Sequence, residues 1–305
     1  MNCRCALQSI TDAPHRSVVA RRAATERCGH NANAGNATIA IAAKKCTMVP
    51  SQNCVPVNDK TMKYAVVMAA GKGTRMKSEL PKVLFPILER PMIEYVLDAL
   101  EQADVEKIIV VVGYRSDLVR ETLSPRHNLA FVEQTEQLGT GHAVMTCHEQ
   151  LKTHHDSVMV VAGDCPMIQV ESIRKLFEAY NHESPPSCIL GTAIKENPFG
   201  LGRILRDEKG EFQGIVEEKD ASPEQKQITE VNMSYYVFHT PDLLEALTHL
   251  RTDNAQKEYY ITDTPSILKS QGKRVVALPV LQPIESLGIN TVEEAKIVEE
   301  AMRHC

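Results

Sequence analysis

The stretch Met68-Ala-Ala-Gly-Lys-Gly-Thr-Arg75 closes an apolar run over residues 64–68 and stands shortly before Pro81 and Lys82. This order is typical of a buried strand that leads into a flexible turn at an anionic ligand. Glycines let backbone N–H groups approach phosphate oxygens, and Lys and Arg supply the countercharge. The spacing matches neither GxxxxGK[ST] nor GxGxxG. On its own, the stretch therefore predicts either a phosphate-binding loop or an ordinary turn after a strand.

Strands and helices alternate regularly from Lys63 onward. Apolar strands are predicted over 63–69, 107–113, 129–134 and 157–164, and helices from 91 and over 117–123, 140–151 and 170–182. The strand over 107–113 is apolar on both faces, as buried parallel strands are. The alternation predicts an α/β fold with a doubly wound, mostly parallel sheet.

The second half of the chain is more mixed. Strands are predicted over 187–193, 202–206, 212–217, 228–239 and 274–280. Helices are predicted from 240, near 258–271 behind a cap region at 253–256, and over 292–303. No internal repeat occurs. We therefore expect residues 62–305 to form one domain, in which 200–240 is a small β-rich lobe on the substrate side.

Residues 1–61 differ in composition from the rest of the chain. They carry eight Lys and Arg against three Asp and Glu, whereas the remainder carries 26 and 36. They also show no sustained periodicity, so we expect a disordered N-terminal extension. An upstream stretch that precedes the natural start at Met62 and a targeting leader are the alternatives. The acidic main body gives no reason to expect a nucleic-acid partner.

The nine cysteines include no CxxC pair, and those in the main body are widely spaced. This usage indicates reduced thiols and a cytoplasmic location. No run approaches the roughly 18 apolar residues of a transmembrane helix, so no membrane partner is expected. The sequence does not indicate an oligomeric state.

Polar residues follow several of the predicted strands, and ligands in open α/β sheets bind at the carboxyl ends of strands. Gln134, Gln137, Gly139 and Thr140 follow the strand over 129–134. Amides can hold the edge of a base, and Thr140 can cap the next helix while its N–H groups face an anion. A polar loop with a cap is the alternative.

Asp164 ends the strand over 157–164 and suits either a Mg²⁺ ligand beside phosphates or an ordinary turn before proline. Asn290 stands before the last helix. Its residue type predicts a helix cap, with cation ligation as the alternative. Cys165 has no base placed to activate it, and His142 fits a surface or packing role. Neither is expected to act as nucleophile or base.

Eight segments occur together in the order and approximate spacing of one family. They are MAAGKGTRM (68–76, followed by Lys82), QTEQLGTGHA (134–143), AGDCP (162–166), GLGRI (200–204), IVEEKDA (215–221), EVN (230–232), DNAQKEYYITD (253–263) and GIN (288–290). Over about residues 63–295 the chain resembles the nucleotidyltransferases that act on sugar 1-phosphates. It most resembles the uridylyltransferase domain of the bifunctional bacterial enzyme that makes UDP-N-acetylglucosamine. The resemblance implies a Rossmann-like nucleotide-diphospho-sugar transferase fold.

The resemblance also implies a role for each matching position. The uridine and phosphate pocket would be lined by Met68, Ala69, Ala70 and Gly71. The triphosphate and the reacting phosphates would be held by Arg75 and Lys82. Uracil and neighbouring groups would be recognised by Gln134, Gln137, Gly139 and Thr140. The essential Mg²⁺ would be held by Asp164 and Asn290, and the amino sugar would be contacted by Gly202, Glu217 and Asn232.

The implied reaction is an in-line attack of a sugar 1-phosphate oxygen on the α-phosphorus of UTP, with pyrophosphate leaving. Catalysis would then be positioning and neutralisation of charge, without a protein nucleophile. N-acetylglucosamine 1-phosphate is the sugar substrate that the resemblance implies. The alternatives are the same chemistry on another pair, such as glucose 1-phosphate or dTTP, and a non-catalytic sensor of nucleotide sugars.

Three places depart from the family pattern. Ala162 stands where the family usually has Tyr, Met233-Ser234 where it has Thr-Gly or Ser-Gly, and Lys257 where it has Gly. Two of these lie near the expected sugar. The bifunctional enzyme continues into a left-handed β-helix of hexapeptide repeats, and this sequence contains no such repeat. Acetyltransferase activity and the trimer that the β-helix builds are therefore not expected.

Overall fold

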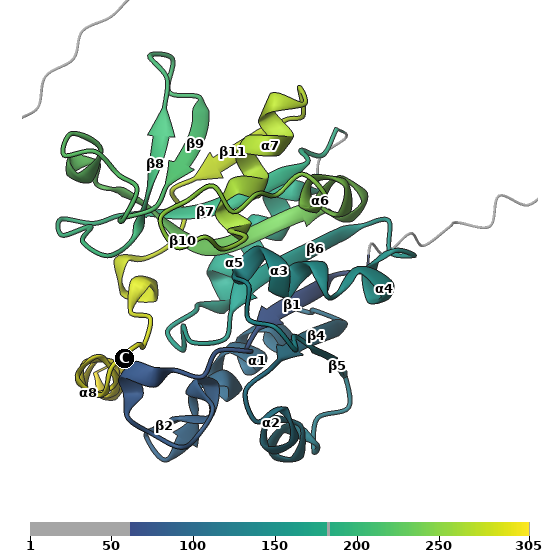
Figure 1. Cartoon of the computed structure of the whole chain (residues 1–305), viewed down its shortest axis with the longest axis vertical. Coiled ribbons are helices and arrows are strands. Elements are labelled where there is room, and N and C mark those ends of the chain that lie inside the picture. Colours follow the sequence, from purple (N-terminus) through teal and green to yellow (C-terminus); the bar gives the residue numbers. More distant parts are fainter. Residues whose placement is uncertain (1–61, 182–183, 305) are drawn as a thin grey trace, which may run out of the picture. The chain divides into compact units, whose positions relative to one another are not determined.

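The main sheet carries β1 (Tyr64–Met68) between two parallel neighbours. The computed structural model describes residues 62–181 and 184–304 (Figure 1). The strand order is β11-β7-β10-β6-β1-β4-β5. The other strands on this path are β4 (Lys107–Val112), β5 (Leu129–Glu133), β6 (Ser157–Ala162), β7 (Cys188–Ile194), β10 (Glu230–His239) and β11 (Val275–Leu278). Because β1 pairs in parallel with β4 and β6, and β4 with β5, the predicted doubly wound fold is confirmed.

The long strand β10 makes the sheet mixed, since it runs antiparallel to both β6 and β7. Its first residues also pair with β8 (Gly202–Arg206), which forms a hairpin with β9 (Phe212–Val216). This hairpin and the start of β10 form the β-rich lobe, which was expected over 200–240; the rest of β10 runs in the main sheet between β6 and β7. The register of β10 on β7 shifts between Asn232 and Tyr235, where Ser234 has a φ of 56°.

Helices cover both faces of the sheet (Figure 1). They are α1 (Met92–Gln102), α2 (Ser116–Leu123), α3 (Thr140–Met145), α4 (His148–Leu151), α5 (Val170–Tyr180), α6 (Thr240–Leu247) and α7 (Thr264–Ser270). Successive strand residues point to opposite faces. Val67 and Val110 therefore pack with α1, α2 and α5, whereas Val66 and Ile109 pack with α3, α6 and α7.

A third apolar cluster attaches the C-terminal helix α8 (Val292–Arg303) to the body of the fold. Ala295 and Val298 of α8 and the preceding Ile289 pack with Met76 and Met92. The short strands β2 (Pro86–Ile87) and β3 (Arg90–Pro91) lie in the same region. This packing places the segment just before α8 next to the glycine-rich loop.

Some expected elements are wrong in extent. The helix expected near 258–271 is a 3₁₀ turn, Ile261–Asp263, followed by α7, and 253–256 caps no helix. Its first residues are extended because Tyr259 N–H donates to Leu138 O (2.9 Å) and Tyr259 O accepts from Gly141 N–H (2.7 Å). The helix expected over 140–151 divides into α3 and α4 around Cys147.

The expected disordered extension over 1–61 lies outside the described residues. Within the described part of the chain, no helix combines the length and the apolar character that crossing a bilayer requires.

Candidate active site

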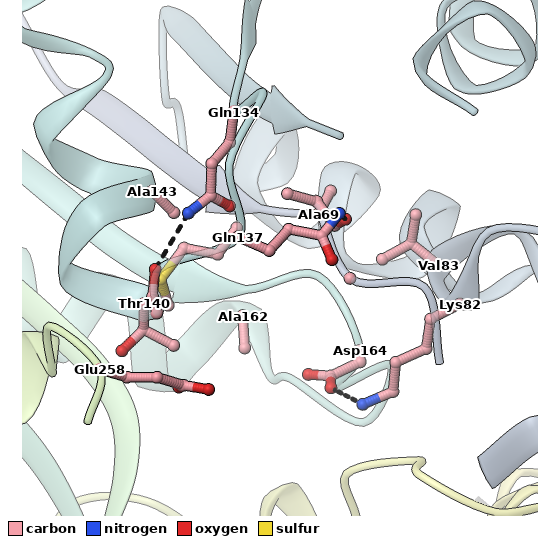
Figure 2. Close-up of a pocket in the computed structure, with 14 residues that line it drawn as sticks. Ala69, Lys82, Val83, Gln134, Gln137, Thr140, Ala143, Ala162, Asp164 and Glu258 are labelled. Atoms are coloured by element: carbon pink, nitrogen blue, oxygen red, sulfur yellow. Dashed lines mark hydrogen bonds and ion pairs between the residues drawn. The ribbon is translucent and has the colours of Figure 1, made fainter. Parts of the chain in front are cut away.

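The carboxyl ends of β1 and β6 open onto a cavity of about 270 Å³. Ten of the residues implied by the family resemblance line it: Met68, Ala69, Ala70, Gly71, Lys82, Gln134, Gln137, Gly139, Thr140 and Asp164. Figure 2 shows the two glutamines at one side of this cavity and the Lys82–Asp164 pair at the other. We call it the nucleotide cavity.

Backbone hydrogen bonds hold the glycine-rich loop, one to the end of the sheet and one within the loop. Ala69 N–H donates to Val111 O (2.9 Å), and Met76 N–H donates to Gly73 O (2.9 Å). Gly73 has a φ of 67°, and a Cβ there would lie 2.7 Å from Lys82 Cβ. Glycine at this position therefore lets the Lys82 side chain pass close to the loop.

The two glutamines each use their amide N–H₂ group within the protein. Gln134, which is 3% exposed, donates through Nε2 to Gly139 O (3.1 Å) and lies 3.1 Å from His142 Nδ1. Gln137 donates through Nε2 to Ala70 O (3.2 Å). Within the described residues neither Oε1 has a hydrogen-bond partner, so both carbonyl oxygens are available to accept from an N–H group of a ligand.

A polar cluster closes the other side of the nucleotide cavity. Lys82 Nζ donates to a carboxylate oxygen of Asp164 and to Asn290 Oδ1 (2.8 Å), and Arg75 Nη2 donates to the same Asn290 oxygen (3.0 Å). Two cations thus meet one carboxylate and one amide. The backbone brings these distant segments together, since Ile289 N–H donates to Asp164 O (3.1 Å).

Asn290 is not the helix cap that its residue type predicts. Thr291 is the N-cap of α8: its Oγ1 accepts from Glu294 N–H (3.1 Å), and Glu294 Oε2 accepts from the N–H groups of Asn290 (2.6 Å) and Thr291 (3.1 Å). A Thr-x-x-Glu capping box thereby satisfies the helix start. The Asn290 side chain is left to face Lys82 and Arg75.

Asp164 and Asn290 also fit a Mg²⁺ ion in the chemistry of their donors. Both present hard oxygens, and both aim them at one positive group, the Lys82 ammonium. No cluster of three or more His, Cys, Asp or Glu suited to a metal occurs among residues 62–181 and 184–304. A site of this kind suits an ion that takes one or two protein oxygens and completes its shell with phosphates and water.

The sugar-contacting residues implied by the resemblance gather in the lobe. Gly202 pairs with Asn232 across β8 and β10, and a Cβ on Gly202 would lie 3.5 Å from Glu217 Oε1. Asn232 is 5% exposed, and its amide is hydrogen-bonded to the Tyr236 hydroxyl. Burial raises the pKa of Glu217, although a hydrogen bond with Thr262 acts to lower it. Gly202 and Asn232 do not line the nucleotide cavity or the second cavity described next.

A second cavity of about 300 Å³ lies against the lobe and includes Glu217 and Tyr260. Thr140 and Glu258 line both this cavity and the nucleotide cavity, so the two share a wall. We call the second one the lobe cavity. Glu218, which lines the lobe cavity, has a structural contact as well, because it binds the buried guanidinium of Arg203 (2.7 Å).

The sequence interpretation assigned no site role to several residues around these cavities. Ala162 and Glu258 line the nucleotide cavity. Lys195, which donates to Ser286 Oγ (2.5 Å), lines a neighbouring hollow together with Arg75 and Asn290. Glu258 and Ala162 belong to the quoted motifs DNAQKEYYITD and AGDCP, and Ala162 was noted only as a departure from the family pattern. Lys195 carries no signal beyond its place at a strand end.

Cys165 has the properties of an inert thiol. Burial and the adjacent Asp164 raise its pKa well above the usual range. The same holds for Cys147, whose pKa burial raises to about 12. A thiol in this state is a poor nucleophile, so no covalent intermediate on cysteine is expected.

Comparison with known proteins shows that the sequence is similar to nucleotide-handling domains. The family model described as "MobA-like NTP transferase domain" matches residues 65–263. The "Bifunctional protein GlmU" of Streptococcus agalactiae serotype V (strain ATCC BAA-611 / 2603 V/R) is 44% identical over 241 residues, which are 79% of this chain and 52% of that protein. The protein of the same name from Enterococcus faecalis (strain ATCC 700802 / V583) is 42% identical over 75% of this chain and 49% of its own. The chain thus spans about half the length of the curated relatives it matches.

Solved structures show the same fold at low sequence identity. A crystal structure of UDP-glucose pyrophosphorylase complexed with UDP-glucose superposes with a TM-score of 0.62 at 21% identity, over 80% of this chain and 99% of that one. A putative glucose-1-phosphate thymidylyltransferase from Bacillus anthracis, in complex with a sucrose, gives 0.65 at 16% identity, over 80% and 96%.

Proposed function

The chain belongs to the MobA-like NTP transferase domain family, and from this membership we propose that it transfers UMP from UTP to a sugar 1-phosphate. N-acetylglucosamine 1-phosphate is the proposed acceptor, and UDP-N-acetylglucosamine and pyrophosphate are the products. The observation that carries the proposal is the cluster of Lys82, Arg75, Asp164 and Asn290 beside a cavity with two free amide oxygens. The sequence identity of 42–44% to the GlmU relatives supports the choice of substrates.

The residues of the nucleotide cavity divide between the base and the phosphates. The carbonyl oxygen of Gln134 or Gln137 accepts from N3–H, the single N–H donor that uracil keeps in UTP. The glycine-rich loop, Arg75 and Lys82 receive the triphosphate. An oxygen of the sugar 1-phosphate forms a bond to the α-phosphorus while the bond from that phosphorus to the pyrophosphate oxygen breaks. Both cations then face charge that develops on the phosphates, which is where electrostatic stabilisation counts most.

Mg²⁺ is the proposed cofactor, held by Asp164 and Asn290 together with phosphate oxygens. Once bound, it neutralises charge on the reacting phosphates. Lys82, which faces the same two oxygens in this structure, contributes a second positive charge at that point. The chain's own residues thus supply both the ligands of the ion and a cation beside it.

The sugar is proposed to lie over the lobe, in reach of Gly202, Glu217 and Asn232. Ala162 lines the nucleotide cavity at a position where the family pattern has Tyr, and glucose 1-phosphate stays the alternative acceptor. Residues 62–305 are proposed as the catalytic domain. A cytoplasmic location remains a prediction that rests on the thiols, of which Cys147, Cys165 and Cys188 are free.

Pyrophosphate release over a panel of nucleoside triphosphates and sugar 1-phosphates tests this function. We expect the highest kcat/KM with UTP and N-acetylglucosamine 1-phosphate, and no activity without a divalent cation. A preference for dTTP or glucose 1-phosphate would replace the substrates and keep the chemistry. Absence of release with every pair, together with tight binding of UDP-sugars, would instead indicate a sensor.

A further inference from the structure

Glu258 forms part of the wall that the nucleotide cavity and the lobe cavity share. Figure 2 shows its side chain extending into the nucleotide cavity near Thr140, on the side away from Lys82. A ligand that extends into both cavities lies along the wall that Glu258 and Thr140 form. No role follows for it from the cluster of cations and metal ligands described above.

The backbone of Glu258 is fixed by the side chain of Asn254. Asn254 Oδ1 accepts from Glu258 N–H (3.1 Å), and Asn254 Nδ2 donates to Glu258 O (2.6 Å). The next residue, Tyr259, exchanges hydrogen bonds with Leu138 and Gly141. Both ends of the peptide that carries Glu258 are therefore held in place before any ligand arrives, which is the condition for precise recognition.

The segment is also fastened to the loop that carries the glutamines. Thr140 Oγ1 accepts from Ile261 N–H (3.1 Å). A Cβ on Gly139 would lie 2.8 Å from Glu258 Cβ, so the glycine is what lets the carboxylate approach this loop. The proposed base site and Glu258 thus belong to one rigid unit.

The carboxylate itself has little to bind inside the protein. Its one side-chain contact in the described part of the chain is a weak one from Gln256 Nε2 (3.4 Å), and no Lys or Arg there pairs with it. An ionised carboxylate only accepts hydrogen bonds, and its two oxygens can take two neighbouring O–H donors at once. Phosphates repel such a group, whereas the hydroxyls of a sugar ring match it.

We propose that Glu258 binds substrate by accepting hydrogen bonds from sugar-ring hydroxyls, and so selects substrates that carry them. The proposal rests on the proposed nucleotidyl transfer, because that reaction places two sugar rings beside this wall. The ribose of the nucleotide and the hexose of the sugar 1-phosphate offer the same chemistry. Kinetics with deoxy analogues of each substrate distinguish the ribose from the hexose.

The test uses the full chain with Glu258→Gln, which keeps the shape and removes the charge. We expect the KM of one substrate to rise about 10- to 100-fold, the usual loss for a hydrogen bond to a charged group, with kcat changed less than about threefold. A rise confined to UTP, with lost discrimination against 2′-deoxy-UTP, assigns the ribose. A rise confined to the sugar 1-phosphate, with lost discrimination against deoxy-sugar analogues, assigns the hexose.

The matched control is Asp253→Asn, which neutralises an exposed carboxylate of the same segment that lines neither cavity. It should leave both KM values unchanged. If Glu258→Gln unfolds, the wild-type preference for UTP over 2′-deoxy-UTP and for the intact sugar over its deoxy analogues decides instead. Equal use of the deoxy compounds by the wild type would overturn the proposal.

Two further outcomes would also overturn it. Unchanged KM values in a folded Glu258→Gln variant would show that the carboxylate contacts no substrate. A raised requirement for Mg²⁺ at unchanged KM would show that it ligates the metal. Both outcomes require an active wild-type protein, so they leave the proposed function standing; a wild type that releases no pyrophosphate would count against that function itself.

Discussion

At the scale of single residues, Asp164 carries the sharpest expectation. Its carboxylate and the Asn290 amide accept from one ammonium, and these two oxygens are the proposed ligands of the Mg²⁺ ion. We predict that Asp164→Ala lowers kcat at least ~100-fold, a loss of roughly 3 kcal/mol of transition-state stabilisation. Pyrophosphate-release kinetics at saturating Mg²⁺ measure this. Turnover within a few-fold of the wild type would refute the metal assignment.

Lys257 stands where the family pattern has glycine, and its backbone conformation is strained. Its φ is 55°, a left-handed conformation that costs a non-glycine residue about 1–2 kcal/mol. We predict that Lys257→Gly stabilises the protein by about 0.5–1 kcal/mol, since the extra freedom of the unfolded glycine offsets part of the gain. Urea unfolding measures the change. Lys219, also exposed and without a positive φ, is the control: Lys219→Gly should destabilise.

At the scale of elements, Gly139 joins the loop before α3 to the segment that precedes α7. Its φ is 111°, and a Cβ would lie 2.6 Å from Tyr259 O. Gly139→Ala should therefore raise the KM for UTP about tenfold or more and lower the unfolding free energy by about 1–3 kcal/mol. Gly210→Ala is the matched control, with a φ of 80° and no atom within 4 Å of the added Cβ. It should cost stability through strain alone, and equal kinetic damage in both variants would count against the contact.

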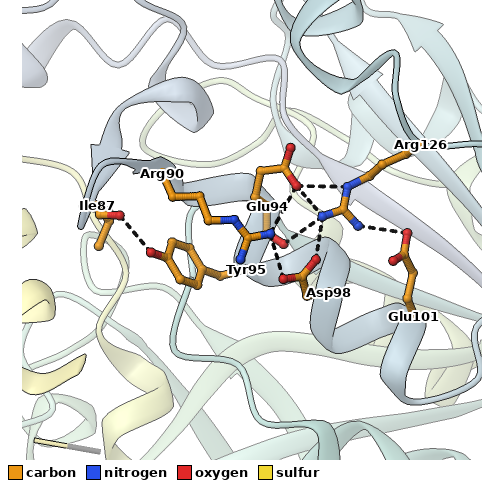
Figure 3. A network of polar contacts seen from close by, with 7 residues as sticks. All are labelled: Ile87, Arg90, Glu94, Tyr95, Asp98, Glu101 and Arg126. Atoms are coloured by element: carbon orange, nitrogen blue, oxygen red, sulfur yellow. Dashed lines mark hydrogen bonds and ion pairs between the residues drawn. The ribbon is translucent and has the colours of Figure 1, made fainter. Parts of the chain in front are cut away.

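A network of charges fastens helix α1 to the segment between α2 and β5. The Arg126 guanidinium reaches Glu94, Asp98 and Glu101, and Arg90 also binds Asp98 (2.7 Å) (Figure 3). Partial burial acts to raise the pKa of Asp98, but hydrogen bonds from Arg126 and Arg90 hold it below its usual range. The side chain of Arg126 is 14% exposed, so the ion pairs are partly shielded from water.

The expected effect of this network depends on pH with a definite sign. Because the pKa of Asp98 is lowered on folding, its contribution is present above the unfolded pKa and is lost as the pH falls through the folded one. Arg126→Met should cost about 2 kcal/mol at pH 7, and that difference should shrink as the pH falls below about 4. Urea unfolding of both proteins across this range measures it. A difference that stays constant with pH would assign the loss to packing.

At the scale of the whole molecule, sequence patterns predicted the individual strands and helices better than the tertiary contacts between them. The apolar runs marked β1, β4, β5 and β6, because buried parallel strands leave a strong local signal. The residue type of Asn290 and its place just before the last helix predicted a helix cap. The actual N-cap is its neighbour Thr291, which forms a capping box with Glu294. Its position beside Lys82 follows from the packing of α8, which no local pattern contains. Glu258 was missed for the same reason: the pairing of its segment with residues 138–141 is a tertiary contact.

The final prediction concerns the extent of the catalytic unit. Among the residues that the structure describes, the buried members of the three apolar clusters run from Ala65 to Val298, and every proposed site residue lies between Met68 and Asn290. A variant that starts at Met62 should therefore keep the thermal midpoint, kcat and both KM values of the full chain. Deleting α8 is the contrasting change, because Ala295 and Val298 pack with Met76 and hold Asn290 near Arg75; it should abolish turnover. A loss of activity on removing residues 1–61 would show that the functional unit begins before Met62.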